Sequence, residues 1–184
     1  MRGQPRGFTL VESIIVMVII GFAIVSLTTV LFPQIARSGD PNYQVRAAAL
    51  GQSLMSQILG RGFDEESDFD GDYIRCSASD TGSTGCTGSD SSSVALGSDT
   101  GESAPNFDDV DDYIGCWEPD GTNGCGNLNL LLKDSATTYK NFNVTISVAY
   151  DNADFEDWSM KLITLTISAS NQPPITFKAF RGNY

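Results

Sequence analysis

The chain contains no histidine among its 184 residues. That absence excludes Ser-His-Asp and Cys-His nucleophilic catalysis and removes a common side-chain ligand of zinc. Basic residues are also few, because 11 lysines and arginines stand against 23 acids, which gives a formal net charge of −12. So acidic a balance argues against binding nucleic acid, or an anionic lipid surface, through a basic patch.

Charge is missing altogether from one long stretch near the start. After Glu12 no charged side chain occurs until Arg37. About 25 helical residues at a rise of ~1.5 Å each span ~37 Å, which is enough to cross a hydrocarbon core of ~30 Å. Arg2 and Arg6 precede the stretch, so the positive-inside rule predicts a cytoplasmic N-terminus with the remaining domain outside.

Glu12 is the informative residue of this stretch. A carboxylate in a membrane helix costs about 2.5–3.5 kcal/mol on insertion scales, so it calls for a partner. No base lies within a turn on its C-terminal side. Cleavage after Gly7 would leave Phe8 with a free α-amine, with which Glu12 of a neighbouring subunit could pair. The alternative is an uncleaved anchor whose glutamate snorkels to the cytoplasmic surface.

The motif Gly7-Phe8-Thr9-Leu10-Val11-Glu12 follows a basic leader and opens an unbroken apolar run. It resembles the prepilin peptidase site of type IV pilins and type II secretion pseudopilins. The resemblance implies cleavage between Gly7 and Phe8, N-methylation of Phe8, and a role of Glu12 in assembly. A secretory signal fits less well, because its apolar core has about 7–15 residues and ends at a small-residue cleavage site.

Four further stretches resemble minor prepilins of this family: residues 32–38, 43–53, 107–113 and 180–184. The resemblance implies a non-enzymatic subunit held in the bacterial inner membrane with its C-terminal domain in the periplasm, and found on the pilus at the cell surface after assembly. The implied partners are other major and minor pilins, the prepilin peptidase, the pilus assembly platform and inner-membrane lipid.

The resemblance and the patterning divide the chain into four parts: a leader at 1–7, a membrane and assembly segment at 8–32, a kinked amphipathic helix at 33–62, and a globular domain at 63–184. Pro33 and the run from Ser38 to Asn42 oppose helix continuation, so we expect helix to resume at Tyr43. Its apolar side chains then recur at three- to four-residue spacing, as a stripe that packs on a sheet: Ala47, Leu50, Leu54, Met55 and Ile58.

The C-terminal third alternates apolar and polar residues over 142–150 and 160–170, and again from Ile175. Alternation with short turns predicts a three-stranded antiparallel meander. Residues 128–132 predict a short helix or an edge strand. A helix stripe covering a sheet face makes an α+β fold, which is also the type IV pilin-like fold that the resemblance implies.

Residues 63–115 form a long acidic stretch that is rich in serine, glycine and aspartate. Its middle part, 77–103, has little to bury and predicts a surface loop. The chain has four cysteines, Cys76, Cys86, Cys116 and Cys125, and their spacing suggests two local disulfides, although three pairings are possible. Zinc is disfavoured because CxxC spacing is missing.

Two acidic clusters could supply the oxygen ligands that calcium requires. They comprise Asp68, Asp70, Asp72, Asp108, Asp109, Asp111 and Asp112. The first cluster departs from the register of an EF-hand, and we favour a solvated acidic loop with no cofactor.

These observations favour a non-enzymatic minor pilin. A tip adhesin that uses residues 68–125 as its contact surface, and a type II secretion pseudopilin, are the alternatives. A membrane-tethered enzyme has no catalytic constellation behind it.

Overall fold

The computed structural model describes residues 9–37, 40–67, 75–90, 92–132, 139–151, 158–169 and 172–183. The leader, Gly7, Phe8 and the first acidic cluster lie outside these residues. The chain divides into two compact units, Met1–Asn42 and Tyr43–Tyr184, and each is described by itself. We call the second unit the head.

The first unit contains one long helix, α1 (Leu10–Arg37). It continues past Pro33, although a proline inside a helix removes one backbone hydrogen bond and crowds the carbonyl four residues earlier. The second helix, α2 (Asp40–Leu59), begins at Asp40, three residues earlier than we expected. The reason is that Pro41 falls in the first turn, where no backbone donor is needed and its fixed φ suits a helix.

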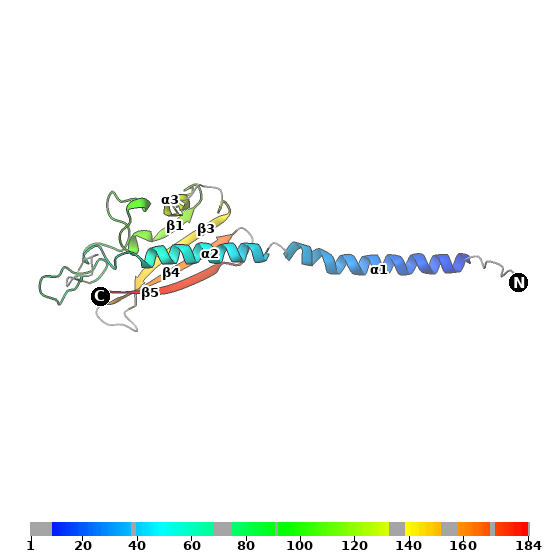
Figure 1. Cartoon of the computed structure of the whole chain (residues 1–184), viewed down its shortest axis with the longest axis horizontal. Helices are drawn as coiled ribbons and strands as arrows, with labels where there is room; N and C mark the ends of the chain where they lie inside the picture. The colour runs from blue at the N-terminus through cyan, green and yellow to red at the C-terminus, as the bar shows by residue number, and fades with distance from the viewer. Residues whose placement is uncertain are drawn as a thin grey trace. The chain divides into compact units, whose positions relative to one another are not determined.

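The head is built on a five-stranded sheet with the order β2-β1-β3-β4-β5 (Figure 1). The strands are β1 (Gly115–Glu118), β2 (Gly126–Asn127), β3 (Phe142–Tyr150), β4 (Met160–Ala169) and β5 (Ile175–Gly182). Strands β3, β4 and β5 form the predicted antiparallel meander. The sequence did not predict β1 and β2, which pair with each other in parallel, and the run at 128–132 forms a short helix, α3 (Leu128–Leu132).

Helix α2 packs against the sheet through the predicted apolar stripe. All five stripe residues are buried with alternate side chains of β3 and β4 in one core. The contact with β5 is close, because a Cβ added at Gly51 would lie 2.2 Å from the ring of Phe177. The head is therefore an α+β layer of the type IV pilin kind, as predicted.

The acidic stretch contributes more to the core than its composition predicted. Two 3-10 helices, η1 (Ala104–Asn106) and η2 (Asp111–Tyr113), follow its serine-rich part. Phe107 packs edge-on against Tyr113 and Trp117, and all three rings are buried. A few aromatic side chains suffice, since each of them buries a large apolar area.

Candidate functional site

Helix α1 presents an apolar surface on every side. Its segment Leu10–Phe32 is long and apolar enough to cross a membrane, and none of it is buried within the chain. Even its largest side chain, Phe22, is 78% exposed. In water such a surface would be strongly unfavourable, so the helix needs lipid or other helices around it.

Glu12 lies in the first turn of α1 and takes part in its start. Its backbone N–H donates to Oγ1 of Thr9 at 3.3 Å. The spacing Thr9-x-x-Glu12 is that of a capping box, in which an acid at this position also suits the positive end of the helix dipole. Glu12 therefore has a local role at the helix start in addition to any contact with another subunit.

Three hydroxyl groups in the middle of α1 are satisfied within the helix. The hydroxyls of Ser26, Thr28 and Thr29 donate to backbone carbonyls three or four residues earlier, at 2.8–3.1 Å. In lipid, hydroxyls without such partners would carry a desolvation cost. Glu12 thus remains the lone ionisable side chain between Thr9 and Phe32.

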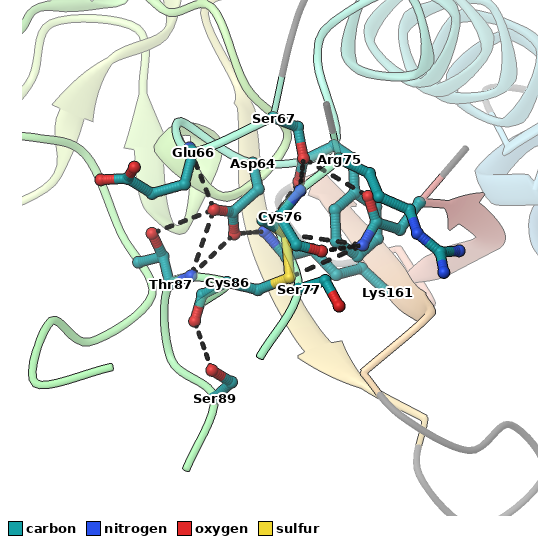
Figure 2. The surroundings of a disulfide bond; sticks show 12 residues. Asp64, Glu66, Ser67, Arg75, Cys76, Ser77, Cys86, Thr87, Ser89 and Lys161 are labelled. Atoms are coloured by element: carbon teal, nitrogen blue, oxygen red, sulfur yellow. Dashed lines mark hydrogen bonds and ion pairs between the residues drawn. A yellow bond between two sulfur atoms is a disulfide. The ribbon is translucent and has the colours of Figure 1, made fainter. Parts of the chain in front are cut away.

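In the head, the disulfide Cys76–Cys86 closes a loop of the acidic stretch inside the structure (Figure 2). Both sulfur-bearing residues are buried. Asn183 donates from Nδ2 to the carbonyl of Cys76 at 2.8 Å, and Ser67 accepts from the Cys76 N–H at 3.1 Å. These bonds attach the loop to the end of the chain and to the segment that follows α2.

A buried lysine lies beside this disulfide. Lys161 of β4 has a fully buried side chain, and its Nζ donates to Oδ2 of Asp64 at 2.8 Å, to the carbonyl of Phe63 at 2.7 Å, and to Oδ1 of Asp111. Nζ also lies 4.7 Å from the ring centre of Phe63 and 5.4 Å from that of Tyr150. One cation is therefore enclosed by two carboxyl groups and two aromatic rings, away from water.

Asp64 is held by donors on its other sides. Thr87 donates to it from its backbone N–H at 3.1 Å and from its hydroxyl at 3.2 Å, and Glu66 donates its backbone N–H at 3.2 Å. Figure 2 shows the Asp64 carboxyl group between Thr87 and Lys161. Burial raises the pKa of Tyr150, and its protonated hydroxyl donates to the Thr87 carbonyl at 2.7 Å.

The solvated loop that we favoured for the second acidic cluster is wrong for three of its four members, because Asp109, Asp111 and Asp112 are buried. Asp109 accepts the N–H groups of Asp111 and Asp112, and Asp112 accepts those of Asp108 and Asp109. Asp111 instead accepts a hydrogen bond from Nζ of Lys161. Backbone donors and one ammonium replace the water that these carboxyl groups would otherwise require.

Two residues of this turn also belong to a group of three neighbouring carboxyl groups. Glu102, Asp108 and Asp112 each offer an oxygen within 4.8 Å of the others, and among the described residues they are the ones that could hold a metal ion. Burial, reinforced by Asp112, raises the pKa of Glu102 to about 7. Burial, reinforced by Asp111, raises the pKa of Asp109 to about 8.

The predicted calcium ligands are thus divided. Asp108 and Asp112 lie together with Glu102, a residue that we did not include, whereas Asp109 and Asp111 serve the turn and Lys161. Asp68, Asp70 and Asp72 lie outside the described residues. Calcium binding stays a prediction.

The second disulfide, Cys116–Cys125, joins β1 to the residue before β2. Cys116 is exposed, unlike the first pair. Trp117, the next residue, points into the core and donates from Nε1 to the carbonyl of Tyr113 at 2.9 Å. Both pairs are the local ones that the spacing suggested, and no described cysteine is free.

Sequence reasoning missed Lys161, although the pattern of its strand contained the signal. Burial alternates along β4, and Lys161 has the same phase as Ile163, Leu165 and Ile167. A lysine in phase with a buried face requires a buried acceptor, because an unpaired ammonium there would be very costly.

Comparison with known proteins bears on the N-terminal segment. The family model of the prokaryotic N-terminal methylation motif matches residues 2–28, which include Gly7, Phe8 and Glu12. The chain carries a prepilin N-terminus. With the fold of its head, it is a type IV pilin-like protein, and the motif implies processing by a prepilin peptidase and assembly with pilins. One apolar helix near the N-terminus is consistent with a prepilin anchored in the inner membrane. No curated protein and no solved structure was found to match the chain.

Proposed function

We propose that the protein is a minor pilin, an assembly subunit of a type IV pilus rather than an enzyme. The observation that carries the proposal is the pairing of a methylation motif with a helix whose apolar surface is exposed throughout. Such a helix needs other helices around it. Cleavage after Gly7 would give each subunit a free N-terminal amine, with which Glu12 of a neighbouring subunit of the same family can pair.

The member of the family that we propose is a minor prepilin of the mannose-sensitive haemagglutinin (MSHA) pilus system. Residues 32–38, 43–53, 107–113 and 180–184 support this assignment by their resemblance to it. A type II secretion pseudopilin would use the same physics for protein export, and the genes beside this one would distinguish the two systems.

The proposed sequence of events starts in the inner membrane, with the N-terminus cytoplasmic and the head periplasmic. The prepilin peptidase cuts between Gly7 and Phe8 and methylates Phe8, and the assembly platform then draws the subunit into a filament. Lipid already shields the apolar surface of α1, so transfer gains little from the hydrophobic effect. Packing and the pairing of Glu12 with the N-terminal amine of a neighbour then decide which subunits join.

Two measurements test the proposal in cells that process known prepilins. Intact mass and N-terminal sequencing of the membrane-extracted protein should find a chain that begins at methylated Phe8, and Gly7→Val should abolish this form. A wild-type chain that still begins at Met1 would overturn the pilin assignment.

Two substitutions separate the proposed role of Glu12 in subunit pairing from its role at the start of α1. Glu12→Gln keeps a capping-box residue but loses the charge, whereas Glu12→Ala loses both. A charged hydrogen bond contributes about 1.5–3 kcal/mol, so both variants should enter filaments at least about tenfold less than wild type, with cleavage intact. Normal incorporation of Glu12→Gln would contradict the pairing, and Ser13→Ala serves as the matched control.

A further inference from the structure

The buried lysine of the head has the surroundings of a reactive amine. Nζ of Lys161 touches carboxyl groups of both Asp64 and Asp111, and all three side chains are at most 1% exposed. The rings of Phe63 and Tyr150 close the site against water. Groups held in contact in this way react as though present at about 10⁵–10⁸ M.

The charges of this site are unbalanced. One ammonium faces the carboxyl groups of Asp64 and Asp111, and Asp109 is near enough to interact electrostatically with Asp111 and Lys161. Buried charges are costly even when they are paired. Condensation of an ammonium with a carboxylate to an amide removes two charges and releases one water molecule, so it relieves this cost.

The two carboxyl groups are suited to different roles. Asp64 receives donors from Thr87 and Glu66, which hold its carboxyl group 2.8 Å from Nζ of Lys161. Burial raises the pKa of Asp111, in opposition to Lys161, which makes its neutral acid form accessible. Gly97 donates its N–H to Oδ2 of Asp111 at 3.2 Å and can stabilise negative charge that develops on that oxygen.

We propose that Lys161 and Asp111 condense to an intramolecular isopeptide bond, with Asp64 as the proton carrier. The Asp64 carboxylate takes a proton from the Lys161 ammonium. The neutral amine attacks Cγ of protonated Asp111, so that an N–C bond forms. Asp64 gives its proton to the departing hydroxyl, which leaves as water, and then takes the second proton from nitrogen. One ammonium, one carboxylic acid and the Asp64 carboxylate thus yield one amide, one water and a protonated Asp64, without any oxidant or cofactor.

The bond would attach η2 to β4, two elements whose linked residues are 50 positions apart. It would hold the acidic stretch to the sheet under conditions that reduce both disulfides. This inference is independent of the proposed pilus function, because it concerns the head alone.

Mass spectrometry of the full chain, extracted in detergent and then reduced, tests the proposal. The protein should be lighter than its sequence mass, counted from its measured N-terminus, by one water molecule. After trypsin, Lys161 should resist cleavage, and the peptide 76–133 should be joined to the peptide 141–178. A chain of full mass with cleavage at Lys161 would overturn the proposal, whatever its N-terminus is.

Variants assign the roles. Asp111→Asn should form the same bond with loss of ammonia, and so reach the mass of the wild-type protein. Asp64→Asn should keep the shape of the site but leave Lys161 unlinked, so that this variant has its full sequence mass. Lys161→Arg removes the amine and should also have its full sequence mass. Lys178→Arg, on the exposed face of β5, is the matched control and should retain the bond. Attachment of Lys161 to the peptide that contains Asp64 would overturn the assignment of Asp111.

Discussion

The N-terminal helix and the head both place ionisable groups away from water, but they satisfy them differently. In the head, Lys161 finds two carboxyl groups within the same chain. In α1 the structure shows no ion pair among residues 9–32, and the backbone N–H of Glu12 bonds to Thr9 at the start of the helix. The difference teaches that the head supplies the partners of its buried lysine from its own chain, whereas the helix depends on partners supplied by other chains.

The largest expected effect comes from removing the internal partner of the head. Lys161→Met keeps most of the side-chain volume but leaves Asp64 and Asp111 without the nitrogen that both contact. Breaking a buried pair on one side costs about 3–5 kcal/mol, so we expect the free energy of unfolding to fall by at least that amount. Chemical denaturation of the detergent-extracted full chain measures it.

The comparison is sharpest when the same measurement is made on three variants. Lys178→Met, on the exposed face of β5, should change the stability by no more than about 0.5 kcal/mol. Glu12→Gln should likewise leave the head unchanged while it lowers assembly. If Lys161→Met is as stable as Lys178→Met, the stability of the head does not depend on its buried lysine. That result would contradict the difference drawn here between the head and α1.

A smaller effect separates the two disulfides within the head. Their sequence separations are 10 and 9 residues, so the chain-entropy model assigns about 2–3 kcal/mol to each. Cys76 and Cys86 are buried, whereas Cys116 is exposed. Replacing the buried pair by alanine should therefore cost about 1 kcal/mol more, because it also removes packing in the core.

Urea midpoints of the two double variants measure this difference. Limited reduction offers a second comparison, since a thiolate reagent should open Cys116–Cys125 before Cys76–Cys86. Equal midpoints together with equal rates of reduction would show that burial does not distinguish the two bridges.

Local patterns predicted much of this molecule. The apolar run before Arg37, the stripe of α2 and the alternation in β3 and β4 each depend on neighbours a few residues apart, and each was recovered. The start of α2 is harder to predict, because Asp40-Pro41 is typical of a break in a helix although the same dipeptide can also begin one.

Long-range contacts could not be predicted in the same way. Strand β1 has four residues, and its main partner is β3, so no alternation marks it. Asp64 and Lys161 are 97 residues apart, and nothing local tells the four buried aspartates from the exposed ones. Only the position of Lys161 on the buried face of β4 indicates that an acid elsewhere in the chain is buried beside it.

The last comparison concerns pH. Unfolded glutamate and aspartate have pKa values of about 4.3 and 3.9, whereas the folded chain raises that of Glu102 to about 7 and that of Asp109 to about 8. Between these values the folded state holds protons that the unfolded state has lost. The stability that these groups contribute is therefore fully present below about pH 4 and is lost as the pH rises through 7 and 8.

The unfolding temperature should accordingly fall between pH 5.5 and pH 8.5, a range set by the shifts of Glu102 and Asp109 and their linkage to folding. Glu102→Gln should make this dependence shallower, while Asp120→Asn, an exposed acid between β1 and β2, should not. If the carboxyl groups of Glu102, Asp108 and Asp112 bind calcium, calcium added at the alkaline end of this range should raise the unfolding temperature of the wild type more than that of Glu102→Gln. A wild-type unfolding temperature that rises with pH would show that these acids are ionised in the folded state. The head would then, like α1, carry charges that need a partner from outside the chain.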